Sequence, residues 1–65
     1  MTKDEAISHM QQGKKITHYL FEIDEWMTMN SDGNIVLEDG VECSLSEFFK
    51  YRSGECWNDN YAYFN

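Results

Sequence analysis

The sequence predicts a single α+β domain, and three observations lead to this prediction. Two segments carry the capping residues of short helices, one at the start of the chain and one in its second half. Short runs of β-branched and aromatic residues lie between and after them, as is typical of strands. With 65 residues and no proline, the chain has room for only one thin core. We therefore expect one domain over residues 1–65: a helix, an antiparallel meander of about four strands, a short second helix and a closing strand.

The first helix is predicted over Lys3–Gln12. Thr2 and Glu5 have the spacing of a capping box, in which each side chain accepts a hydrogen bond from the other residue's amide. The apolar residues recur at helical spacing and form one narrow stripe, made of Ala6, Ile7 and Met10. Gly13 supplies a residue that tolerates positive φ and ends the helix.

The next part of the chain predicts a meander of strands separated by turns. The expected strands are Ile16–Phe21, Trp26–Met29, Ile35–Glu38 and Val41–Cys43. Asn30–Asn34 and Asp39-Gly40 are expected to form the hairpin turns, because Asp-Gly and Asn tolerate positive φ. Alternation along the first strand is expected to place Ile16, His18 and Leu20 on one face.

The second helix is predicted to begin after Ser44, which stands three residues before Glu47 in another capping-box pattern. Leu45, Phe48 and Phe49 give it an apolar face, and Gly54 is expected to end it. Tyr61–Phe64 is expected to form the closing strand.

The residues that could carry catalysis or bind a metal do not form a recognisable motif. The histidines His9 and His18 stand alone; we expect His9 to face solvent and His18 to be partly buried and hydrogen-bonded. Cys43 and Cys56 lack metal-ligand spacing, and both are expected to behave as small apolar side chains. We therefore expect a protein that is not an enzyme and that uses no metal and no cofactor.

The charge is unevenly distributed along the chain. The formal net charge is −7, and no Lys or Arg occurs between Ile16 and Phe49. The acids of this window are Glu22, Asp24, Glu25, Asp32, Glu38, Asp39, Glu42 and Glu47. Such a chain cannot neutralise phosphates, so we exclude direct nucleic-acid binding and favour a partner protein with a basic surface. The alternative is that the acids only maintain solubility. The chain has no signal-peptide pattern and no membrane-length apolar stretch, so we expect a cytoplasmic protein without membrane contact.

The aromatic residues are more than so thin a core can enclose, so some are expected to be exposed at an interface. A core of this size also supplies little stability, which favours a homo-oligomer. A Trp57, Tyr61 and Tyr63 cluster near the C-terminus is a candidate for this role. The predicted protein-binding residues are Glu22, Asp24, Glu25, Trp26, Glu38, Asp39, Glu42, Trp57, Tyr61 and Tyr63.

Three segments resemble small phage-encoded proteins, and in particular the family of the phage Thoeris anti-defence sponge: Met1–Ala6, Gly13–Ile16 and the Trp-containing end at Trp57–Phe64. The resemblance implies an oligomer that sequesters a nucleotide-derived immune signal between protomers without cleaving it. It makes Lys14 and Lys15 the candidate phosphate contacts and Trp57 or Tyr61 a stacking surface, with His18 as a further ligand contact.

The acidic window favours a different phage strategy over the sponge. In that strategy, a small negatively charged protein occupies the nucleic-acid-binding surface of a host protein. We therefore expect a phage-type inhibitor of a host defence or nucleic-acid-handling protein. The alternatives are a sponge for a cyclic nucleotide and a structural or assembly module without ligand.

Overall fold

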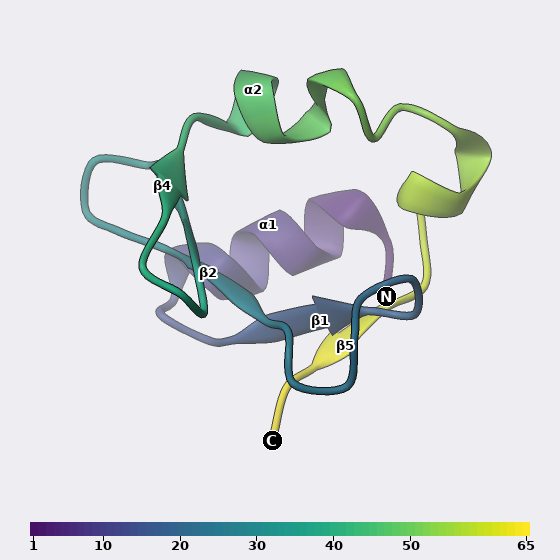
Figure 1. Ribbon diagram of the computed structural model, residues 1–65, viewed down its shortest axis with the longest axis horizontal. Helices are drawn as coiled ribbons and strands as arrows, with labels where there is room; N and C mark the ends of the chain where they lie inside the picture. The colour runs from purple at the N-terminus through teal and green to yellow at the C-terminus, as the bar shows by residue number, and fades with distance from the viewer.

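The computed structural model describes residues 1–65 and has both helices on one face of a five-stranded antiparallel sheet (Figure 1). The elements are α1 (Lys3–Gln11), β1 (Ile16–His18), β2 (Met27–Met29), β3 (Ile35–Leu37), β4 (Glu42–Cys43), α2 (Leu45–Lys50), the 3₁₀ helix η1 (Glu55–Trp57) and β5 (Tyr61–Tyr63). The strand order is β4-β3-β2-β1-β5, so the last strand of the chain pairs beside the first. The predicted α+β class and the meander are confirmed.

Both predicted capping residues begin their helices. The Thr2 hydroxyl accepts from the Glu5 amide at 3.2 Å, and the Glu5 carboxylate accepts from the Thr2 amide at 2.8 Å, which completes the capping box. Ser44 accepts from the Glu47 amide at 3.1 Å, but the Glu47 carboxylate accepts from the Ser44 hydroxyl instead of its amide. The second pattern therefore caps α2 without forming the reciprocal box.

The first strand is shorter than predicted and ends at His18. The Phe21 amide donates to the His18 carbonyl at 2.9 Å, and the Leu20 amide donates to Nδ1 of the His18 ring at 3.1 Å. The chain therefore forms a turn after His18 instead of continuing as a strand beside β2. As a result, Leu20 is half exposed and does not share the buried face of Ile16 and His18, which corrects the prediction.

The glycines fulfil three of their four predicted roles. Gly13, Gly33 and Gly40 have φ of 83°, 80° and 88°, as the ends of helices and hairpins require. Gly54 has φ −68° and precedes η1, whereas α2 ends earlier, at Lys50, with Tyr51 as its C-cap. The prediction that Gly54 ends the second helix is therefore wrong.

The core lies between the sheet and the two helices. It is made of Ala6, Met10, Ile16, Met27, Ile35, Phe48 and Tyr61, with His18 as the one buried polar residue. Ile16 pairs with Met27 and with Tyr63, so these three side chains lie on the face of the sheet that the helices cover. The side chains that alternate with them along the strands form an open face. Trp26 belongs to this open face, because it directly precedes the buried Met27.

The beginning of the chain lies beside the start of β5 (Figure 1). The Lys3 amide donates to the Asn58 carbonyl at 3.0 Å, and the Tyr61 amide donates to the Met1 carbonyl at 3.1 Å. Asn60, between them, has φ 75° and turns the chain into β5. None of the helices has both the length and the apolar character needed to cross a bilayer.

Candidate functional site

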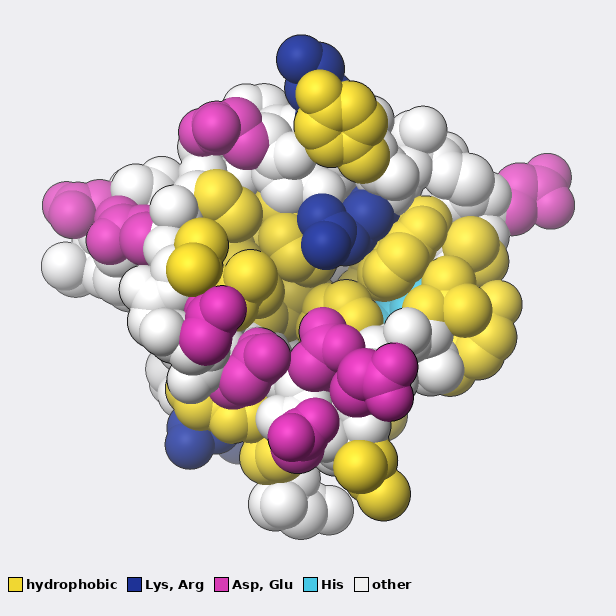
Figure 2. Space-filling view, in the orientation of Figure 1, with side chains coloured by type: hydrophobic (Ala, Val, Ile, Leu, Met, Phe, Trp, Pro, Cys, Tyr) yellow, Lys and Arg dark blue, Asp and Glu magenta, His cyan; other side chains and the backbone are white.

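The acids at one end of the sheet form the clearest functional candidate. Five predicted residues belong to the β1–β2 loop and the β3–β4 turn at this end, and we call them the acidic end: Glu22, Asp24, Glu25, Glu38 and Asp39. The Glu38 amide donates to the Trp26 carbonyl at 3.1 Å, which places the β1–β2 loop beside the β3–β4 turn. Figure 2 shows a group of carboxylates over this loop and turn, with no Lys or Arg between them.

No basic group neutralises the acidic end. The single ion pair of the chain joins the N-terminal amine to Asp59, 3.8 Å apart, at the beginning of β5. The lysines and the arginine instead lie over aromatic rings: Lys3 over Phe49, Lys14 over Tyr63, Lys15 over Trp26, Lys50 over Tyr51, and Arg52 over Phe48 and Trp57. Unpaired carboxylates that share one surface produce a negative potential directed at solvent.

Hydrogen bonds hold the backbone of the β1–β2 loop in one shape. The Glu25 amide donates to the Glu22 carbonyl, and the Glu25 carboxylate accepts from the Glu22 amide, each at 3.0 Å. The Thr17 hydroxyl of β1 donates to the Glu25 carbonyl at 3.0 Å. The acids of the loop are therefore displayed on a fixed turn.

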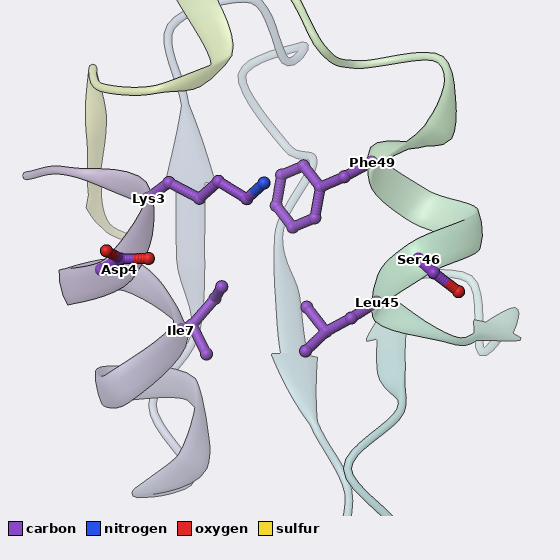
Figure 3. Close-up of a pocket in the computed structure, with 6 residues that line it drawn as sticks. All are labelled: Lys3, Asp4, Ile7, Leu45, Ser46 and Phe49. Atoms are coloured by element: carbon purple, nitrogen blue, oxygen red, sulfur yellow. The ribbon is translucent and has the colours of Figure 1, made fainter.

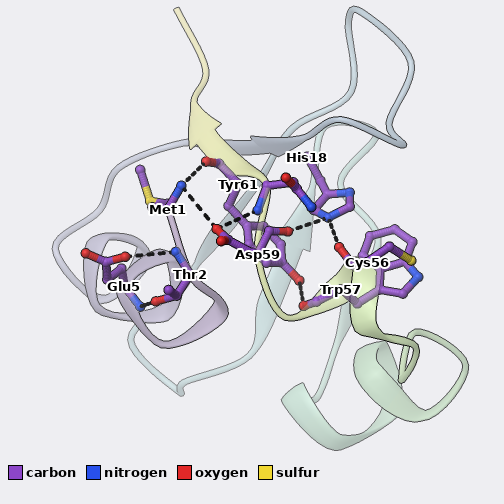
Figure 4. A network of polar contacts seen from close by, with 9 residues as sticks. Met1, Thr2, Glu5, His18, Cys56, Trp57, Asp59 and Tyr61 are labelled. Carbon is purple, nitrogen blue, oxygen red and sulfur yellow. Dashed lines mark hydrogen bonds and ion pairs between the residues drawn. The ribbon is translucent and has the colours of Figure 1, made fainter.

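His18 ties this loop to the C-terminal part of the chain (Figure 4). It is 2% exposed, and its Nε2 lies 2.8 Å from the Cys56 carbonyl and 2.9 Å from the Asp59 carbonyl. Since Nδ1 accepts from the Leu20 amide, the ring proton is on Nε2, which donates to both carbonyls. The prediction of a buried, hydrogen-bonded His18 is confirmed.

Two further predicted binding residues do not belong to the acidic end: Glu42 lies at the other end of β3, and Trp26 adjoins the acidic end only through its backbone carbonyl. The Glu42 carboxylate accepts from the Asn34 amide side chain at 2.9 Å, at the opposite end of β3 from Glu38. This hydrogen bond is the main cause that lowers the pKa of Glu42. Trp26 is half-buried on the open face of the sheet. Lys15 Nζ lies 4.3 Å from its ring centroid, and the ring centroid of Phe64 lies 6.3 Å from it.

The predicted C-terminal aromatic interface is corrected by the structure. Tyr61 is 3% exposed and its hydroxyl donates to the Trp57 carbonyl at 2.6 Å, so it belongs to the core. Trp57 is half-buried and stacks on His18, with ring centroids 4.2 Å apart. Of the three, only Tyr63 is largely exposed, at 48%, and its ring centroid lies 5.0 Å from that of His9 in α1. We expected His9 to face solvent, but its ring is partly buried against Tyr63.

The residues of the alternative ligand site do not come together. Lys14 lies over Tyr63, whose strand pairing places it toward α1, whereas Lys15 lies over Trp26 on the open face. His18 is buried with both ring nitrogens occupied. Lys14, Lys15, His18 and Trp57 therefore do not line one pocket within the chain.

One cleft opens between the two helices and has a volume of about 350 Å³. Figure 3 shows α1 and α2 facing each other across it, with the Lys3 ammonium directed at the Phe49 ring, 4.0 Å from its centroid. Its lining residues are Lys3, Asp4, Ile7, Leu45, Ser46 and Phe49, none of which was predicted as a site residue. No group of three or more His, Cys, Asp or Glu is arranged to hold a metal ion.

Sequence reasoning missed the exposed apolar side chains of the β1–β2 loop. Ile23 is 96% exposed, and Tyr19 and Leu20 are at least half exposed. The signal was present in the run Glu22-Ile23-Asp24, where acids flank an apolar residue between two predicted strands. Comparison of the chain with protein-family models, with curated proteins and with solved structures gave no match.

Proposed function

We propose that this chain is a non-catalytic binding protein whose acidic end docks on a basic surface of a partner protein. The observation that carries the proposal is the convergence of five carboxylates on one rigid end of the sheet without a neutralising base. Charge arranged in this way accelerates the encounter with a positively charged surface and aligns the partners.

The proposed partner is a protein whose basic surface ordinarily accepts nucleic acid. In the phage setting that the sequence resemblance implies, it is a host protein of defence or nucleic-acid handling, and binding inhibits it. The chain would then occupy a surface that phosphates otherwise use, because carboxylates offer the same sign of charge.

The test is affinity capture from bacterial lysate with a pair of variants matched in charge. The first variant removes three exposed carboxylates of the acidic end: Glu22→Gln, Asp24→Asn and Glu38→Gln. The control removes three exposed carboxylates elsewhere: Asp4→Asn, Asp32→Asn and Glu55→Gln. Glu25 and Asp39 stay unchanged because their carboxylates accept backbone hydrogen bonds that shape the loop and the turn.

We expect wild type and control to retain the same basic protein at about 0.1 M salt and to release it at about 1 M, where the Debye length falls to about 3 Å. The acidic-end variant should fail to retain it. Duplex DNA added to the purified complex should displace the chain from its partner. Equal retention by the two variants, or retention insensitive to salt, would contradict the proposal.

A further inference from the structure

We propose that Ile23 is an apolar anchor, which a partner protein buries in an apolar pocket rimmed by Lys and Arg side chains. This inference rests on the proposed function and adds the chemistry of the partner's surface. Ile23 is 96% exposed, more than any other large apolar residue of the chain, although the core has few apolar side chains to spare. Single exposed apolar residues are common on protein surfaces, but this loop carries three, because Tyr19 and Leu20 are also at least half exposed, and apolar side chains exposed together mark interaction sites.

The loop holds Ile23 in a fixed position. Ile23 and Asp24 are the central residues of the turn that the hydrogen bonds between Glu22 and Glu25 close at both ends. Thr17 fastens the end of this turn to β1. A side chain presented on a fixed backbone loses little conformational entropy on binding, which favours its use as an anchor.

The residue on the near side of the turn shows that the exposure of Ile23 is selective. Phe21, two positions earlier, packs into the core, with its ring centroid 6.1 Å from that of Trp57 and 6.5 Å from that of Phe48. The loop therefore buries one apolar side chain to secure itself and directs the other away from the protein. Interfaces commonly place one such side chain at the centre of a polar rim.

The charges around Ile23 decide what can cover it. Glu22 and Asp24 flank it directly, and neither has a basic partner within the chain. A second copy would bring the same carboxylates against their own counterparts, which is unfavourable. Anionic lipid surfaces and nucleic acid would be repelled in the same way. A protein pocket with an apolar floor and a basic rim satisfies both the isoleucine and the acids.

Two synthetic peptides of equal length and charge test this inference. One is an amphipathic helix built from leucine and lysine, and the other has serine in place of every leucine. Binding of each labelled peptide is measured by fluorescence anisotropy with wild type, Ile23→Ser and Tyr51→Ser. Tyr51 is the matched control, because it is 82% exposed but lies beyond α2 and next to Lys50.

We expect wild type and Tyr51→Ser to bind the leucine peptide about tenfold or more tightly than the serine peptide, and Ile23→Ser to lose this preference. Equal binding of both peptides by wild type, or a preference that survives Ile23→Ser, would overturn the anchor and leave acidic docking intact. Absence of binding by either peptide at about 0.1 M salt would instead contradict the proposed function, and the anchor with it.

Discussion

Replacement of His18 by phenylalanine should destabilise the protein more than any change at its surface. Phenylalanine keeps an aromatic ring against Trp57 but removes both ring nitrogens. The Cys56 and Asp59 carbonyls then lose their donor, and the Leu20 amide loses its acceptor. At about 1 kcal/mol of net stability for each hydrogen bond, the loss is about 3 kcal/mol.

That loss is comparable to the whole stability expected of so small a core, which is about 3–5 kcal/mol. We therefore expect His18→Phe to keep at most about 2 kcal/mol of stability and to have a urea midpoint far below that of wild type, as measured by far-ultraviolet circular dichroism. His9→Phe is the matched control, since the His9 ring has only the Tyr63 hydroxyl as a hydrogen-bond partner; its change should stay within about 0.5 kcal/mol. A His18→Phe protein within about 1 kcal/mol of wild type would refute the view that His18 joins the loop to the C-terminal segment.

Three further predictions concern local contacts. Burial raises the pKa of Tyr61 to about 12, so its contribution to stability is complete below pH 10 and is lost as the pH rises toward 12. Alkaline unfolding curves should therefore show a larger loss of stability over this range in wild type than in Tyr61→Phe. Thr2→Ala removes the acceptor of the Glu5 amide and should cost about 1 kcal/mol in urea unfolding, whereas Thr2→Ser keeps a hydroxyl and should preserve most of the stability; equal losses would argue against the cap. Burial, and secondarily the Glu47 carboxylate, raises the pKa of the Cys43 thiol, so its alkylation near neutral pH should be slow, and faster in Glu47→Gln; an unchanged rate would exclude that influence.

Local features of the sequence determined the order of the two α-helices and five strands and most of their ends to within a residue, but did not reveal η1. Thr2 and Ser44 cap their helices through residues three positions away, and Gly13, Gly33 and Gly40 adopt the positive φ expected of them. These features depend on neighbours along the chain, so they can be read without knowledge of the fold. The gathering of acids in one window was also evident, and it led directly to the acidic end.

The tertiary structure decided which aromatic and polar side chains are available to a partner. Tyr61 is buried and Trp57 is stacked on His18, whose ring bonds to carbonyls 38 and 41 positions away. No pattern of neighbouring residues reveals such contacts, because β5 reaches β1 only when the sheet closes across the whole chain. β1 ends early because Leu20 and Phe21 donate back to His18, whose ring is held by carbonyls of the C-terminal segment. The early end of β1 makes the loop that displays Ile23.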